Sequence, residues 1–182
     1  RLKWCARPLQ LDHSANPILR IVSKAFRMFN PHSIVAHAFG AHLEKLYLEY
    51  FSARNPEYAA YIGGAARLVL ERLGNTDALY HNAEHTMMVT LVGQQMMQGR
   101  LISEAVRPED WLHYTLALLI HDIGYVRGIC REDTEDSVVI SLDGKKITPP
   151  RGSSDAFLAP YHIERGMIYA RERFAQSQFE IG

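Results

Sequence analysis

The chain has 182 residues, 47% of them hydrophobic and 22% charged, which is ordinary composition for one globular domain with a sizeable core. Its 20 basic and 20 acidic side chains give no net charge, which excludes a global field that attracts a nucleic-acid polymer or an anionic membrane. No apolar stretch approaches bilayer-spanning length, and Cys5 and Cys130 offer no disulfide framework. We therefore expect a soluble, cytoplasmic protein.

Helical periodicity dominates the sequence and predicts an all-α fold. In chain order, the expected helices are 17–29, 31–52, 56–73, 83–99, 108–122 and 160–176. Two Asn-Pro pairs, at 30–31 and 55–56, supply a capping residue followed by proline at the first helical position, and Gly74 and Gly124 stand just beyond predicted helix ends. We expect a single domain over residues 1–182, with the helices of 1–74 packed on the later core.

Residues 131–159 depart from the helical pattern. The segments 137–141 and 145–148 flank Asp143-Gly144, a pair that is typical of a tight β-hairpin turn. A small hairpin is therefore expected near 137–148. The polar loop 148–155 then leads to the last helix, and we expect it to fold over the functional site as a substrate wall.

The motif His121-Asp122 ends the apolar run 116–120. A carboxylate without a partner would carry a large desolvation cost there, and a bound cation is the simplest partner. The carboxyl end of a helix also favours positive charge, because its last carbonyl groups are unsatisfied. The position of Asp122 therefore predicts a metal ligand.

A second motif, Tyr80-His81-Asn82-Ala83-Glu84-His85, supplies further nitrogen ligands. His85 begins an apolar stripe at helical spacing that predicts an inward-facing side, formed by Met88, Val89, Val92 and Met96. His81 lies one turn earlier, next to the capping candidate Asn82, and is either a ligand or an acid. One histidine on an apolar stripe is most often a hydrogen-bonded core residue, but two such motifs with an aspartate favour a metal site.

These motifs resemble the HD-domain superfamily of metal-dependent phosphohydrolases over residues 75–175, and the predicted fold is then an HD-type helical bundle. Tyr80-His81-Asn82-x-x-His85 is also similar to a signature of class I cyclic-nucleotide phosphodiesterases. By position, the resemblance implies that His85, His121 and Asp122 hold the metal and that His81 protonates the leaving oxygen. Nitrogen and oxygen ligands suit one or two divalent ions of Mn, Fe, Ni, Co, Zn or Mg.

The sequence departs from the superfamily pattern at two points. Tyr125 stands where the signalling HD-GYP branch has lysine, and no Gly-Tyr-Pro triplet is present, which disfavours that branch. The later aspartate of the superfamily is also missing, since no aspartate follows His162. Asp155 is the least implausible replacement. We expect the fourth protein ligand to lie beyond Gly182, in which case the chain is a fragment.

Other candidate residues carry weaker signals. His162, beside the stripe of Ile163, Met167, Ala170 and Phe174, is balanced between a structural role and a substrate or second-metal role. Arg127, Arg131, Lys145, Lys146 and Arg151 cluster near the motif; Arg151, then Arg127, are candidates for binding phosphate, as is Asn82 for binding substrate. His32, His37 and His42 rotate around a helix, so we expect them at the surface or core edge, and His113 is expected to be structural.

The sequence thus predicts a metal-dependent hydrolase, a phosphatase or phosphodiesterase, acting on a small phosphorylated substrate, a nucleotide or a cyclic nucleotide. Two alternatives stay open. One is an HD-fold di-iron oxygenase, which His162 would serve. The other is a degenerate HD module that acts as a ligand sensor. Self-association into a homo-oligomer is compatible with the sequence.

Overall fold

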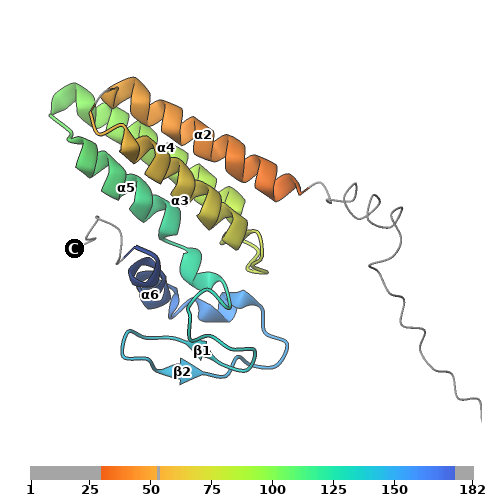
Figure 1. The fold of residues 1–182 in the computed structure, drawn as a ribbon. Coiled ribbons are helices and arrows are strands. Elements are labelled where there is room, and N and C mark those ends of the chain that lie inside the picture. Colours follow the sequence, from red (N-terminus) through yellow and green to blue (C-terminus); the bar gives the residue numbers. More distant parts are fainter. Residues whose placement is uncertain (1–29, 53, 175–182) are drawn as a thin grey trace, which may run out of the picture. The chain divides into compact units, whose positions relative to one another are not determined.

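The computed structural model describes residues 30–52 and 54–174, so the predicted helix 17–29 lies outside the described residues. The chain divides by its internal contacts into residues 1–31 and 32–182, and the second unit is described here. Its helices are α2 (Pro31–Phe51), α3 (Glu57–Leu73), α4 (Ala83–Ser103), α5 (Pro108–Ile120) and α6 (His162–Phe174) (Figure 1). The expected all-α fold is confirmed, and each helix from α2 onward matches a predicted one.

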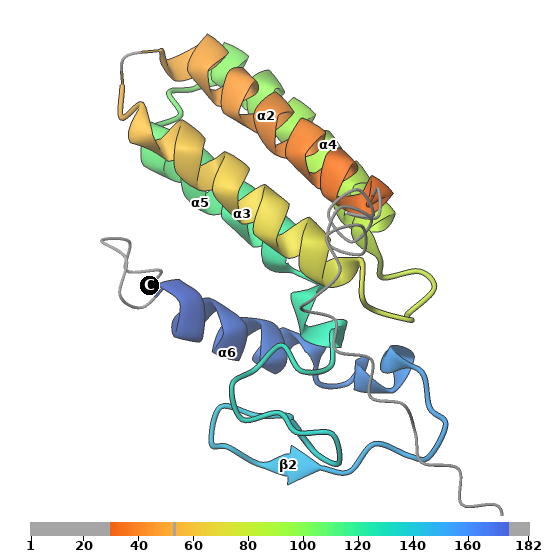
Figure 2. The same cartoon turned by 45° about the vertical axis from the view of Figure 1, so that its right-hand side comes forward.

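Helices α2 to α5 lie side by side as a bundle (Figure 2). Its core contains Tyr47, Phe51 and Trp111, and the Phe51 and Trp111 rings meet edge to face with centroids 5.6 Å apart. Helices α2 and α3 approach closely at Gly40, where a Cβ atom would lie 2.8 Å from the Gly63 carbonyl oxygen. Aromatic packing and this close helix contact hold the four helices around one hydrophobic cluster, and the end of α3 contributes to a second cluster with η1 and α6.

Helix α4 packs against the bundle through its small and polar side. Its buried residues are Thr86, Thr90, Gly93, Gln94 and Met97. The Gln94 amide donates to the Thr115 hydroxyl at 2.9 Å, and Leu118 of α5 fills the space beside Gly93. The predicted inward stripe is therefore wrong, because Met88, Val92 and Met96 are exposed. Glycine and threonine allow closer helix contact than methionine. Hydrogen bonds from Gln94 to Thr115 and from the Thr90 hydroxyl to the Thr86 carbonyl offset part of the cost of burying polar atoms.

Helix α5 ends at Ile120, earlier than the predicted boundary, and Ile123–Tyr125 form a 3₁₀ turn, η1. Gly124 is part of this turn, so the prediction that it stands just beyond a helix end is wrong. A Cβ atom at Gly124 would lie 1.9 Å from the His162 carbonyl oxygen. Gly124 is required because the start of α6 packs directly on the η1 backbone.

The hairpin expected near 137–148 is confirmed. Strands β1 (Val138–Val139) and β2 (Lys146–Ile147) pair antiparallel, and Gly144 in the connecting turn has φ +83°. A 3₁₀ helix, η2 (Asp155–Leu158), precedes α6. The stripe predicted on α6 is only partly inward: Ala170 is buried, but Ile163 and Met167 are exposed and the buried face contains Arg165, Gly166 and Tyr169.

Arg165 is a fully buried cation that joins α6 to the segment after the His121-Asp122 motif. Its guanidinium forms an ion pair with the buried Asp133, with Nη2 2.9 Å from Oδ2. Nε donates to the Gly124 carbonyl and Nη2 to the Val126 carbonyl, both at 2.8 Å, and Nη1 donates to the Val139 carbonyl. All five N–H donors of the guanidinium are thereby used. Sequence reasoning did not identify this residue.

We predict that Arg165→Met lowers the free energy of unfolding by about 3–5 kcal/mol, because it leaves Asp133 buried without a countercharge. Urea denaturation followed by circular dichroism measures this. The control is Lys45→Met, which removes an exposed pair with Glu49 and should shift the denaturation midpoint little. Equal midpoints for the two variants would contradict the buried pair.

Candidate metal centre

The first motif is positioned by the start of α4. Asn82 is the N-cap, and its Oδ1 accepts a hydrogen bond from the His85 amide at 3.0 Å. Its Nδ2 donates to the Leu79 carbonyl, also at 3.0 Å. Both polar groups of Asn82 are thus used to fix the turn that carries His81 and His85. In the structure Asn82, a predicted substrate contact, is the N-cap of α4.

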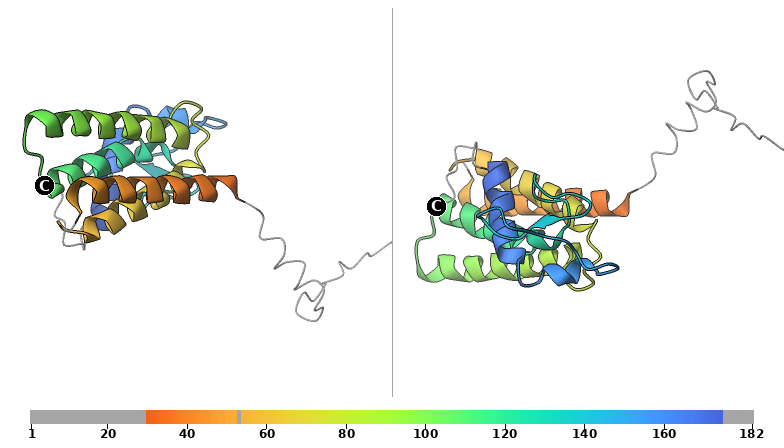
Figure 3. Two further views of the ribbon diagram at one scale, coloured as in Figure 1. Left: turned by 90° about the horizontal axis from the view of Figure 1, so that it is seen from above. Right: turned by 90° about the horizontal axis from the view of Figure 1, so that it is seen from below.

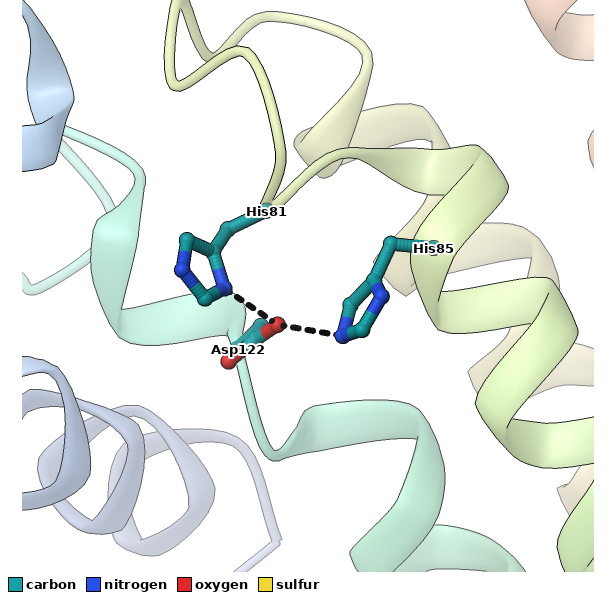
Figure 4. Close-up of side chains that lie close together, drawn as sticks. All are labelled: His81, His85 and Asp122. Carbon is teal, nitrogen blue, oxygen red and sulfur yellow. Dashed lines mark hydrogen bonds and ion pairs between the residues drawn. The ribbon is translucent and has the colours of Figure 1, made fainter.

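Asp122 lies where α5 gives way to η1, with only 2% of its surface exposed. Its Oδ2 lies 2.9 Å from His81 Nδ1, 3.4 Å from His85 Nε2 and 3.0 Å from His121 Nε2. Figure 4 shows His81 and His85 on opposite sides of this carboxylate. The fold therefore brings the two motifs together at the point that the sequence predicted.

One group of residues within the described part of the chain has the spacing of a metal site. The ligand atoms of His81, His85 and Asp122 all lie within 4.8 Å of one another. Two imidazoles and a carboxylate without a thiolate form a donor set that fits a divalent ion. His121 adjoins this group through Asp122 but is not part of it. The structure thus puts His81 alongside His85 and Asp122 as a candidate ligand.

The charge state of the site follows from its burial and hydrogen bonds. Burial alone would raise the pKa of Asp122, but hydrogen bonds from His121 and His81 outweigh it and hold that pKa at about 2. The hydrogen bond to Asp122 raises the pKa of His121, against the opposing effect of burial. Asp122 is therefore an anion over the whole physiological pH range, as a metal ligand requires.

The backbone fixes which nitrogen of His121 faces Asp122. His121 Nδ1 donates to the Leu118 carbonyl at 2.7 Å, so a neutral ring carries its lone pair on Nε2. That lone pair would lie 3.0 Å from the anionic Oδ2 of Asp122. Two electron-rich atoms at this distance need a positive charge between them, which is either a proton on Nε2 or a bound cation.

Aromatic rings surround the histidines. The buried Tyr125 ring stacks on His81, with centroids 4.1 Å apart and planes inclined by 11°. His162 packs on the same Tyr125 at 4.7 Å, and its Nδ1 donates to the Ala159 carbonyl at 2.7 Å. Tyr80 is exposed, and its ring lies 4.6 Å from that of His85. His162 is therefore beside the site, and sequence reasoning assigned no role to either tyrosine.

The loop 148–155, predicted as a substrate wall, is anchored to Thr76, just before the first motif. Asp155 is buried, accepts from the Thr76 hydroxyl at 2.8 Å and pairs with Arg127 Nε at 2.7 Å. The Arg127 guanidinium also lies 5.1 Å above the Phe157 ring. Asp155 is thus occupied by these contacts and is not in the metal group, and Arg127 is largely committed to holding the loop. Arg151 lies exposed at the tip of the same loop.

The remaining predictions for single residues can be compared with the structure. His32, His37 and His42 are exposed, which confirms their expected place at the surface, and His113 is exposed as well. Cys130 is buried, and burial raises the pKa of its thiol to about 12, as expected for an inert core cysteine. Among the residues that the structure describes, no helix combines the length and hydropathy that crossing a membrane requires.

Together, the fold and the site define an all-α protein with a candidate metal centre where the start of α4 meets the end of α5. The chain belongs to the Npun_R2479-like family, whose model matches residues 29–181. No curated protein and no solved structure matches the chain.

We predict that the purified protein contains a divalent metal and that Asp122→Ala removes most of it, because Asp122 contributes the only carboxylate of the group. Elemental analysis of the purified variants measures metal per chain. The matched control is Asp155→Asn, another buried carboxylate, which should retain the metal. Full occupancy in the Asp122→Ala protein would contradict the assignment.

A second prediction concerns the metal-free protein. A pKa raised by Asp122 means that protonated His121 contributes stability below its unfolded pKa of about 6.5, and that this stability is lost as pH rises through the higher folded pKa. We expect Asp122→Asn to abolish this loss. Urea denaturation of the chelator-treated wild type and Asp122→Asn proteins from about pH 6 to pH 9 measures the free energy of unfolding. If it depends on pH in the same way in both proteins, the interaction of His121 with Asp122 is refuted.

Proposed function

We propose that this protein is a metal-dependent hydrolase of phosphate esters, of the HD-domain type that its sequence resembles. The observation that carries the proposal is the convergence of three histidines on one oxygen of a buried carboxylate. Those residues come from the two motifs on which the resemblance rests. A structural core histidine cluster would not require an anionic carboxylate at its centre.

The donor set fits a divalent ion of the classes expected from the sequence, Mn, Fe, Ni, Co, Zn or Mg. His85 and Asp122 would hold it, with His121 Nε2 3.0 Å from the same carboxylate oxygen as a further ligand, and His81 lies within ligand distance of His85 and Asp122. The hydrogen bond from His121 Nδ1 to a backbone carbonyl is the kind of outer contact that orients a metal-binding imidazole. When bound, the ion supplies a water of lowered pKa and polarises the phosphoryl group.

His81 is the candidate general acid of this reaction. Its Nδ1 is hydrogen-bonded to Asp122, and its second ring nitrogen points away from that carboxylate (Figure 4). Asp122 fixes one end of the ring, and stacking on Tyr125 fixes its plane. Protonated His81 would then donate from Nε2 to the departing oxygen of the ester. The competing role is ligation through Nδ1, and the two roles predict different metal contents.

The exposed side of the site has groups suited to holding a small substrate. Tyr80 offers an accessible ring next to His85. His162 Nδ1 donates to the Ala159 carbonyl, so the neutral ring carries its lone pair on Nε2. Arg151 is the cation of the adjoining loop that the structure leaves exposed. A small phosphate ester, a nucleotide and a cyclic nucleotide all remain within the proposed substrate class.

The position of His162 also favours a second candidate, an HD-fold di-iron oxygenase. The His162 ring lies 6.5 Å from that of His81, close enough for Nε2 to serve a second iron. Dioxygen consumption by the iron-loaded protein would support this candidate. Phosphate-ester hydrolysis without dioxygen would support the hydrolase.

We predict that His81→Gln lowers turnover on a phosphatase and phosphodiesterase substrate panel by about 100-fold or more, with metal content retained, because a general acid contributes about that much. His85→Gln should lose both metal and turnover. The control is His113→Gln, an exposed histidine away from the site, which should change neither.

Two outcomes would decide against this assignment. If His81→Gln empties the site, His81 is a ligand and the acid role is wrong. If the metal-loaded wild-type protein hydrolyses none of the phosphate esters in the panel, the proposed activity is wrong.

A further inference from the structure

Helix α4 exposes an apolar face that the described chain does not cover. Met88, Val92 and Met96 are 61%, 55% and 65% exposed, at spacings that align them along the helix, and Leu91 lies beside them. Residues 86–99 contain no charged side chain. A solvated helix face normally carries charge, so an uncharged face of this kind, apolar apart from the exposed Gln95, marks an interaction surface.

The burial pattern of α4 is the reverse of an ordinary amphipathic helix. Its threonines, Gly93 and Gln94 face the bundle together with Met97, while Met88, Val92 and Met96 face outward. In both views of Figure 3, α4 runs along one edge of the bundle. Its outer face is therefore accessible over the length of the helix.

Charges at the two ends of this face indicate what covers it. Glu84 lies eight residues before Val92 and Arg100 eight residues after it, and the two side chains have opposite sign. Antiparallel pairing of two such helices places Val92 opposite Val92 and brings each Glu84 end beside an Arg100 end. Parallel pairing would place like charges together. The face is thus complementary to itself about Val92.

We propose that a second copy of this chain binds this face, with two α4 helices packed antiparallel across a two-fold axis at Val92. A two-fold interface uses the same patch on both copies, which is the property that this face has. Arg100 now pairs with Glu104 at 2.7 Å, but both side chains are exposed, so exchanging that partner costs little.

Further exposed apolar residues extend the same interface. Leu79 and Ile102 are 94% and 90% exposed and lie at opposite ends of α4. Antiparallel pairing brings Ile102 of each copy toward the end that carries Leu79 of the other. Gly99 adds no side chain to the face and has nothing within 4 Å of its Cβ position, so a second helix can approach there.

Sedimentation equilibrium at about 10–100 μM tests the proposal, and its result does not depend on the proposed hydrolase activity. The wild type should be a dimer, and Val92→Glu should be a monomer with unchanged helicity and metal content, because the two-fold axis brings both new charges together. Ile163→Glu, at an exposed apolar residue on α6, should remain a dimer. A monomeric wild type or a dimeric Val92→Glu would overturn the proposal. A monomer is also the result expected if another segment of the chain covers the face.

Cysteine cross-linking tests the register in a Cys5→Ser background, where the remaining native Cys130 is buried. Val92→Cys should form a disulfide-linked dimer with itself. Met88→Cys and Met96→Cys should cross-link when mixed and not when alone, because antiparallel pairing sets residue 88 beside residue 96. Cross-linking of Met88→Cys with itself, or failure of Val92→Cys to cross-link, would overturn the antiparallel arrangement.

Discussion

The buried pair of Arg165 and Asp133 holds together the segment on which the site depends. Residues 121–140 contain little regular structure, so their backbone groups need other partners. Arg165 donates to carbonyls before and within the hairpin, and Asp133 accepts from the backbone amide of Val139 at 2.9 Å. Two charges that would be costly to bury singly thus stabilise the turn that begins at Asp122.

Asp122 is held by a second set of constraints that meet at the same turn. The α4 cap fixes His85, the Leu118 carbonyl fixes His121, and the Tyr125 ring fixes the plane of His81. Gly124 allows α6 to approach closely enough to place His162 against Tyr125. The side chains around the carboxylate are therefore oriented by backbone and aromatic contacts outside the donor group, as a preorganised metal centre requires.

Helix α4 shows why hydrophobicity alone did not identify its buried face. Met88, Val92 and Met96 are spaced as on one face of a helix, and burying them would release more transfer free energy than burying threonine and glycine. The opposite side of α4 is nevertheless the buried one. The Leu118 side chain occupies the space that a side chain at residue 93 would fill, and Gln94 donates a hydrogen bond to Thr115. Close packing and satisfied hydrogen bonds decide the helix orientation, and both depend on residues of α5 that no periodicity on α4 reveals.

The sequence by itself determined the features that arise from neighbouring residues. Periodicity and proline signals located the helices, although the N-cap of α3 is Pro56 and not the predicted Asn55. Asp143-Gly144 located the hairpin, and the isolated position of Asp122 marked the site. The tertiary structure decided which face of α4 and α6 is buried, that Asp155 binds Arg127, and that His81 lies within ligand distance of His85 and Asp122. These outcomes depend on contacts between distant segments, such as the burial of Arg165 against Asp133, and the local patterns of the sequence do not specify them.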